Sequence, residues 1–193
     1  MSVIAWLLHP RQHPTAKIGL MFRNTRALPA FVLVLSLHAY PCSRVTPVSS
    51  VEMVNQADVI VRAIAEKYDV APKNPNLVTT GVPDSTVHFH VLEVIRGHAR
   101  TDLTLPGYLS DKDDFNDHPS PYNFVRPGGR AGSCIANTYR SGAQFLLLLK
   151  KEQSGELTAN WYALGPVNEQ LHSTNDPWLL WVRTEARSQK SVK

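Results

Sequence analysis

The chain has 193 residues, of which 43% are hydrophobic, and only two cysteines. The hydrophobic content excludes a disordered protein, and two cysteines are too few for a small fold built on several disulfides. The formal net charge of +4 resides in residues 1–39, which hold four basic residues and no acidic one. The rest of the chain is neutral, which argues against nucleic acid as a partner because nucleic-acid-binding proteins carry a basic surface.

The first part of the chain has the layout of an export signal. Basic residues after Met21 precede the apolar run Ala30–Leu37. This run is too short to cross a bilayer as a helix but is typical of the hydrophobic region of a signal peptide. Ala39 is a small residue that suits cleavage, which would leave no membrane span in the released protein. An uncleaved anchor is the alternative.

This interpretation divides the chain into two regions. Residues 1–39 are the signal peptide region, and 1–20 are interpreted as a mis-assigned upstream start because Met21 begins a conventional signal. Residues 40–193 are a single mature domain. We therefore expect the protein to be exported, which means secreted, periplasmic or at the cell surface.

The mature region has strand and turn patterns between two helices. Ser49 or Ser50 caps a predicted helix over 49–56, and Asp176 with Pro177 opens a C-terminal helix. The segments with β-branched, apolar or alternating patterns are 58–66, 86–95, 102–105, 143–149 and 157–164. Because strands do not alternate with helices, we predict a mainly β fold. The expected form is a small OB-fold-like barrel of five to six strands with a short N-terminal helix and a C-terminal helix.

Residues 106–133 are a long polar loop between two of the predicted strands. A connection of this length in a compact domain is usually functional or disordered. The acidic run that begins at Asp111 lacks the glycine and the glutamate of a helix-loop-helix calcium site. A solvated acidic surface is therefore the simpler interpretation of this run.

The two cysteines, Cys42 and Cys134, are expected to form one disulfide, because exported proteins usually join their cysteines. The bridge would close a loop of 92 residues. On the chain-entropy model it would stabilise the fold by at most about 4–5 kcal/mol. It would tie the start of the mature domain to the segment before the 143–149 strand.

Several segments together resemble the netrin-like family, which includes the tissue inhibitors of metalloproteinases (TIMPs). A cysteine close to the mature N-terminus is followed by Ala57–Arg62, by Val87–Gly97, and by Gly132–Cys134 leading into Tyr139–Leu148. The resemblance implies an OB-type barrel and secretion. It also implies a non-enzymatic role as a protease inhibitor or another protein-binding module.

The inhibitors of that family bind the protease zinc with the free amine and carbonyl of a mature Cys-x-Cys start, at the open position of the metal. The corresponding residues here are Cys42, Ser43 and Arg44, so the second cysteine is absent. Cleavage after Ala39 also places two residues before Cys42. Zinc chelation by the N-terminus would require cleavage after Pro41.

No strong catalytic motif accompanies this pattern. His88 and His90 lie on one face of the 86–95 strand, and a His-x-His pair can bind a metal. No third ligand stands at a defining spacing, so we predict neither a metal site nor a cofactor. The glycine-rich stretch Arg126–Ser133 lacks the Gly-Lys-Ser/Thr ending that binds phosphate.

The sequence therefore predicts an exported, non-enzymatic binding domain with a protein partner, for which a zinc metalloprotease is the first candidate. The predicted binding surface combines the N-terminal segment with the long loop: Cys42, Ser43, Arg44, Asp111, Asp113, Asp114 and Phe115. Two alternatives stay open. One is an envelope-associated structural domain without inhibitory activity, and the other is a metal-dependent enzyme that uses His88 and His90.

Overall fold

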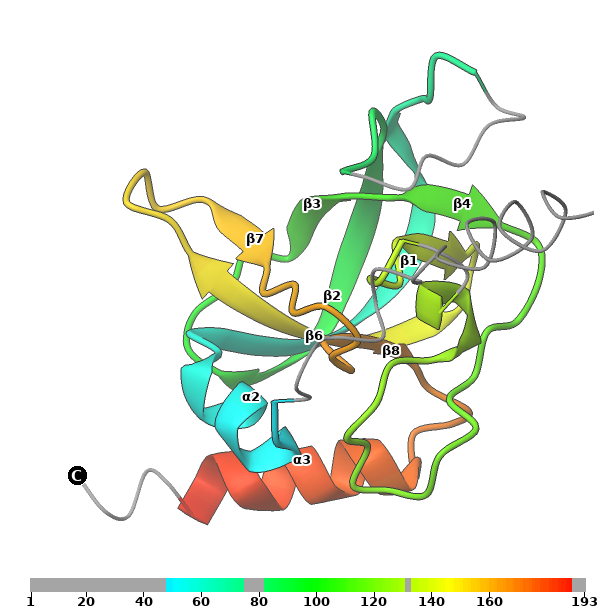
Figure 1. Ribbon diagram of the computed structural model, residues 1–193. Helices are drawn as coiled ribbons and strands as arrows, with labels where there is room; N and C mark the ends of the chain where they lie inside the picture. The colour runs from blue at the N-terminus through cyan, green and yellow to red at the C-terminus, as the bar shows by residue number, and fades with distance from the viewer. Residues whose placement is uncertain (1–47, 75–81, 131–132, 189–193) are drawn as a thin grey trace, which may run out of the picture. The chain divides into compact units, whose positions relative to one another are not determined.

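Six antiparallel strands form the main sheet of the protein (Figure 1). The structure is a computed structural model that describes residues 48–74, 82–130 and 133–188. These residues belong to one compact unit of the chain. The predicted signal region 1–39 and residues Cys42, Ser43 and Arg44 lie outside the described residues.

The main sheet has the strand order β3-β2-β1-β6-β7, and β7 and β8 pair with successive parts of β6. Its strands are β1 Val59–Val70, β2 Thr86–Arg96, β3 Asp102–Pro106, β6 Gln144–Lys151, β7 Leu157–Ala159 and β8 Asn168–Gln170. Two short strands, β4 (Tyr108–Ser110) and β5 (Thr138–Arg140), pair in parallel as a second sheet. The helices are α2 (Ser50–Gln56), α3 (Pro177–Ser188) and the 3-10 helix η2 (Pro127–Arg130).

Successive residues of β1 and β6 point to opposite faces of the sheet and supply two hydrophobic cores. On one face, Val61, Phe89 and Phe145 pack with Tyr139 of β5. On the other face, Ile60 packs with residues of β6, α2 and α3: Leu146, Leu148, Met53, Val54, Trp178, Leu179 and Val182. Residues 145–149 are fully buried. Both faces of this strand are therefore buried, one in each core.

Both predicted helices are present with the expected caps. Ser49 Oγ accepts a hydrogen bond from the amide of Glu52 at 3.2 Å, and Asp176 Oδ1 accepts one from the amide of Trp178 at 2.9 Å. These bonds satisfy amides that have no partner within the helix. The buried Trp178 stacks on Tyr122, with ring centroids 5.2 Å apart, and so helps to fix α3 against its core.

Two strand boundaries differ from the prediction. The last predicted strand, 157–164, ends at Ala159, and Leu164 has a positive φ of 62° that an extended strand does not allow. The first strand continues to Val70 because it pairs with β2 as far as Thr86. The sequence pattern also missed β8, because its three residues are polar although they are buried.

The mainly β class with flanking helices is confirmed, but the described sheet is not closed into a barrel. Strands β3 and β7 stand at the two ends of the strand order and share no strand pairing. In the described part of the chain, no helix has the length and apolar character needed to cross a membrane.

Candidate functional site

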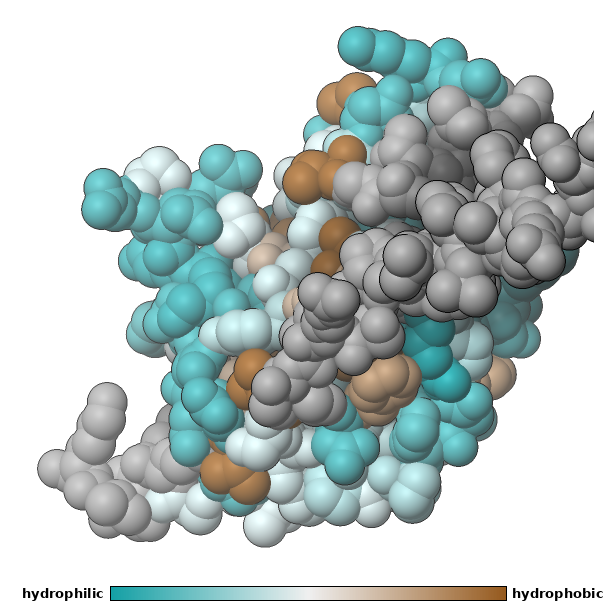
Figure 2. Space-filling view, in the orientation of Figure 1, coloured by the Kyte–Doolittle hydropathy of each residue, from teal (hydrophilic) through white to brown (hydrophobic). Residues whose placement is uncertain are grey.

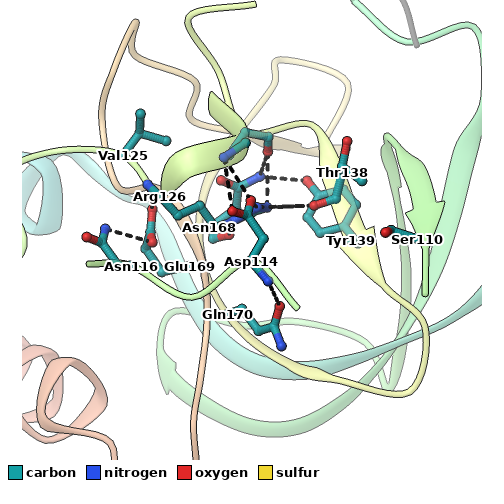
Figure 3. Close-up of polar contacts among 12 residues, drawn as sticks. Ser110, Asp114, Asn116, Val125, Arg126, Thr138, Tyr139, Asn168, Glu169 and Gln170 are labelled. Carbon is teal, nitrogen blue, oxygen red and sulfur yellow. Dashed lines mark hydrogen bonds and ion pairs between the residues drawn. The ribbon is translucent and has the colours of Figure 1, made fainter. Parts of the chain in front are cut away.

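The long loop is folded around one buried guanidinium, that of Arg126 (Figure 3). Its side chain is fully buried, and Nη1 donates to Asp114 Oδ2 at 2.8 Å. Other guanidinium nitrogens donate to backbone carbonyls of Ala136, Thr138 and Asn168 at 2.9–3.3 Å. The guanidinium carbon also lies 5.7 Å from the centre of the Tyr139 ring, within cation-π range. Arg126 thus joins the loop, the start of β5 and β8.

Glu169 of β8 is the second buried charge of this network. It is fully buried, and its carboxylate accepts hydrogen bonds from Asn116 Nδ2 at 2.9 Å and from the Arg126 amide at 3.3 Å. Burial raises the pKa of Glu169 to about 7, and the charge of Asp114 adds to the rise. The charge of Arg126 and the two hydrogen bonds oppose it. The loop therefore rests on a carboxyl group that titrates near neutral pH.

Gln170, the last residue of β8, fixes the acidic part of the loop. Its Oε1 accepts from the amide of Asp114 at 2.9 Å, and its Nε2 donates to Asp113 Oδ1 at 2.6 Å. Arg140 of β5 lies 3.0 Å from the same Asp113 oxygen. Phe115 stacks on His172, with ring centroids 4.0 Å apart.

The predicted loop residues differ in exposure, since Asp113 is exposed whereas Asp114 and Phe115 are partly buried. Asp113, Asp114 and Phe115 make contacts within the domain, and only Asp114 pairs with a fully buried partner. Asp111 is exposed at the loop surface. The acidic run thus serves partly to anchor the loop.

His88 and His90 lie on the outer face of β2, beside two carboxylates. Nδ1 of His88 is 3.2 Å from Glu66 Oε2, and Asp102 Oδ1 is 3.4 Å from His88 Nε2 and 3.5 Å from His90 Nδ1. No group of three or more His, Cys, Asp or Glu side chains in the described ranges is arranged to hold a metal ion. These contacts form a surface cluster of two histidines and two carboxylates from β1, β2 and β3.

A small pocket of about 420 Å³ lies where the start of the described chain meets the long loop. Its lining comes from α2 and its cap, from the loop and from α3: Val48, Ser49, Ser50, Val51, Pro121, Asn123 and Trp181. Trp181 is the aromatic residue of this lining, and Ser49, Ser50 and Asn123 are its polar residues. None of the predicted binding residues Asp111, Asp113, Asp114 and Phe115 lines the pocket.

Exposed hydrophobic side chains do not define a second site. The large ones among the described residues are scattered over four elements and one loop: Val51, Val70, Val82, Leu92, Val94 and Leu180. The face in Figure 2 is largely hydrophilic, with hydrophobic residues in small separate groups. Isolated exposed apolar residues are ordinary on protein surfaces.

Sequence reasoning missed Arg126 and Glu169, the residues that organise the loop. One signal was available, because the polar triplet Asn168–Gln170 stands between the apolar residues Val167 and Leu171. Polar residues between apolar ones can be buried with them, and buried polar groups are almost always hydrogen-bonded.

The fold and the site define a mainly β domain that carries a long loop fixed by a buried ion network. No protein-family model matches the chain, and no curated protein matches it.

Proposed function

We propose that the protein is an exported, non-enzymatic binding domain of netrin-like type, and that the long loop and the start of the mature domain form its contact surface. The observation that carries the proposal is the buried attachment of the loop by Arg126 and Glu169. Burying a charged side chain costs several kcal/mol, and apolar residues in the same place often give equal or better stability. Stability alone therefore does not explain why charged side chains hold this loop. A loop held in one conformation benefits a binding surface, because less conformational entropy is lost when a partner binds.

The pocket supports the location of this surface. Val48 to Val51 follow Cys42 closely in the chain and line the pocket together with Pro121 and Asn123 of the loop. Trp181 adds an aromatic wall, and aromatic residues are enriched at the centres of protein interfaces. The expected partner is a protein, and a zinc metalloprotease is the first candidate.

The strand order supports an OB-type barrel that is partly open. Strand β1 lies between β2 and β6, and the terminal strands β3 and β7 of the order lie near each other. Antiparallel sheets that curl in this way protect their edges, as small barrels do. The segments that resemble netrin-like proteins lie largely on β1, β2 and β6.

The test is inhibition and binding by the exported, purified protein against a panel of zinc metalloproteases. A double variant, Val51→Glu with Asn123→Arg, places charge in the pocket at two exposed positions. The matched control is Leu180→Glu, an exposed apolar residue of α3 that does not line the pocket. We expect the double variant to lose at least about tenfold in affinity, or about 1.4 kcal/mol, and the control to bind like the wild type.

Two results would count against the proposal. Absence of binding to every protease in the panel would favour the alternative of an envelope-associated structural domain. Equal loss in the double variant and the Leu180→Glu control would show that the pocket is not the contact surface. Circular dichroism of each variant separates loss of binding from loss of folding.

A further inference from the structure

Each residue of β8 contacts the loop, Asn168 through its backbone and Glu169 and Gln170 through their side chains. Asn168 accepts through its backbone carbonyl from Arg126 Nε at 3.3 Å. Glu169 accepts from Asn116 and from the Arg126 amide, and Gln170 contacts the backbone of Asp114. Asn116 Nδ2 also donates to a carbonyl within the loop, that of Phe124, at 2.8 Å. The attachment is therefore a continuous line of polar contacts with Glu169 at its centre.

The charges in this attachment do not balance when all groups are ionised. Arg126 contributes one positive charge, whereas Asp114 and Glu169 contribute two negative ones. Among the described residues, Arg126 and Asp114 are the charged side chains that act on Glu169. Asn116 and Asn168 are uncharged, and the two tyrosines of the region, Tyr122 in the loop and Tyr139 on β5, have raised pKa values and stay neutral near pH 7. The ionised cluster thus buries one uncompensated negative charge.

We propose that this cluster is a proton-operated latch, in which Glu169 takes up one proton and thereby tightens the attachment of the loop to β8. Protonation removes the uncompensated charge without disturbing the Arg126–Asp114 pair. Opening of the loop exposes Glu169 to water, where its carboxyl group ionises readily. The closed loop is therefore favoured as the pH falls through neutrality, and the open loop gains population as the pH rises.

The shifted pKa of Glu169, at about 7, agrees with this charge balance and places the transition near neutral pH. The latch does not depend on the identity of any partner. Only its consequence for binding, a higher affinity for the partner below neutral pH, rests on the proposed function.

Hydrogen exchange of the full mature protein, measured from about pH 5.5 to 8.5 and corrected for the intrinsic pH dependence of exchange, tests the latch. The reporter amides are those of Asp114 and Gly128, which donate to Gln170 and Asp114. In the wild type we expect their protection to fall by more than tenfold across this range, because a group with a pKa near 7 ionises within it. Glu169→Gln, which mimics the protonated group, should show no such fall.

The matched control is Glu156→Gln, at an exposed turn position, which should keep the pH dependence of the wild type. Constant protection in the wild type, or an unchanged pH dependence in Glu169→Gln, would overturn the latch. If Glu169→Gln does not fold, an NMR titration of the Glu169 carboxyl carbon in the wild type serves as the test in its place. A titration midpoint near 7 supports the latch, and a midpoint below about 5 overturns it.

Discussion

The guanidinium of Arg126 lies 2.8 Å from the carboxylate of Asp114, and none of the Arg126 side chain is exposed. We predict that Arg126→Met lowers the free energy of unfolding by about 3–5 kcal/mol, because it removes the guanidinium that pairs with Asp114 and leaves buried backbone carbonyls without a donor. Arg126→Lys should fall between Met and the wild type, since an ammonium keeps the charge but cannot reach all the acceptors. Urea denaturation at pH 7 measures both. A loss below about 1 kcal/mol in Arg126→Met would contradict the structural role of this residue.

The raised pKa of Glu169 predicts that the stability of the folded protein falls as the pH rises. Its pKa is raised from 4.5 to about 7 in the folded protein, so its contribution is fully present below pH 4.5 and is lost as the pH rises through about 7. Relative to Glu169→Gln, the wild type should lose about 3 kcal/mol of unfolding free energy over this window. Denaturation of both proteins at several pH values measures the difference. A difference that stays constant with pH would refute the prediction.

Glu93 of β2 predicts the opposite dependence. Its carboxylate is bound by Arg183 of α3 at 2.6 Å and by Arg62 of β1 at 3.1 Å. The hydrogen bond from Arg183 is the main cause that lowers the pKa of Glu93. The stabilisation is therefore present above pH 4.5 and is lost as the pH falls through the lowered pKa. Glu93→Gln should cost about 1 kcal/mol at pH 7, and thermal unfolding should show equal stabilities of the two proteins in strong acid.

The disulfide between Cys42 and Cys134 stays a prediction, because Cys42 lies outside the described residues. A peptide map of the exported protein under non-reducing conditions should contain the two cysteine peptides joined to each other. Reduction should lower the free energy of unfolding by up to about 4–5 kcal/mol. The double variant Cys42→Ser with Cys134→Ser provides the control, since its stability should not respond to the reductant. Two separate thiol-reactive peptides in the map would disprove the bridge.

Much of the fold can be read from the sequence because the main elements bury apolar side chains at regular spacing. The caps at Ser49 and Asp176 predict where the two helices begin, and the apolar run at 145–149 predicts the central strand. These signals are local patterns of neighbouring residues, so a single sequence is enough to recognise them. Local patterns do not predict whether the sheet closes, because pairing between the end strands β3 and β7 would depend on residues far apart in the sequence.

The site could be predicted only in outline. The length of residues 106–133 predicts a loop that is functional or disordered, and their polar composition is typical of a solvated surface. The contact between Arg126 and Glu169 joins residues 43 positions apart, and β8 has three polar residues with no strand periodicity. Burial of a charge is decided by such distant partners, so composition alone does not reveal that Arg126 is fully buried beside Asp114.

The mature N-terminus is the most direct test of the account, because export and the composition of the contact surface both depend on it. The full chain should be expressed in a host with a general secretory pathway, and the exported protein analysed by intact mass and N-terminal peptide sequencing. We predict export and a chain that begins at Tyr40, after cleavage at Ala39. A protein that stays in the cytoplasm and still carries the residues before Ala39 would contradict it.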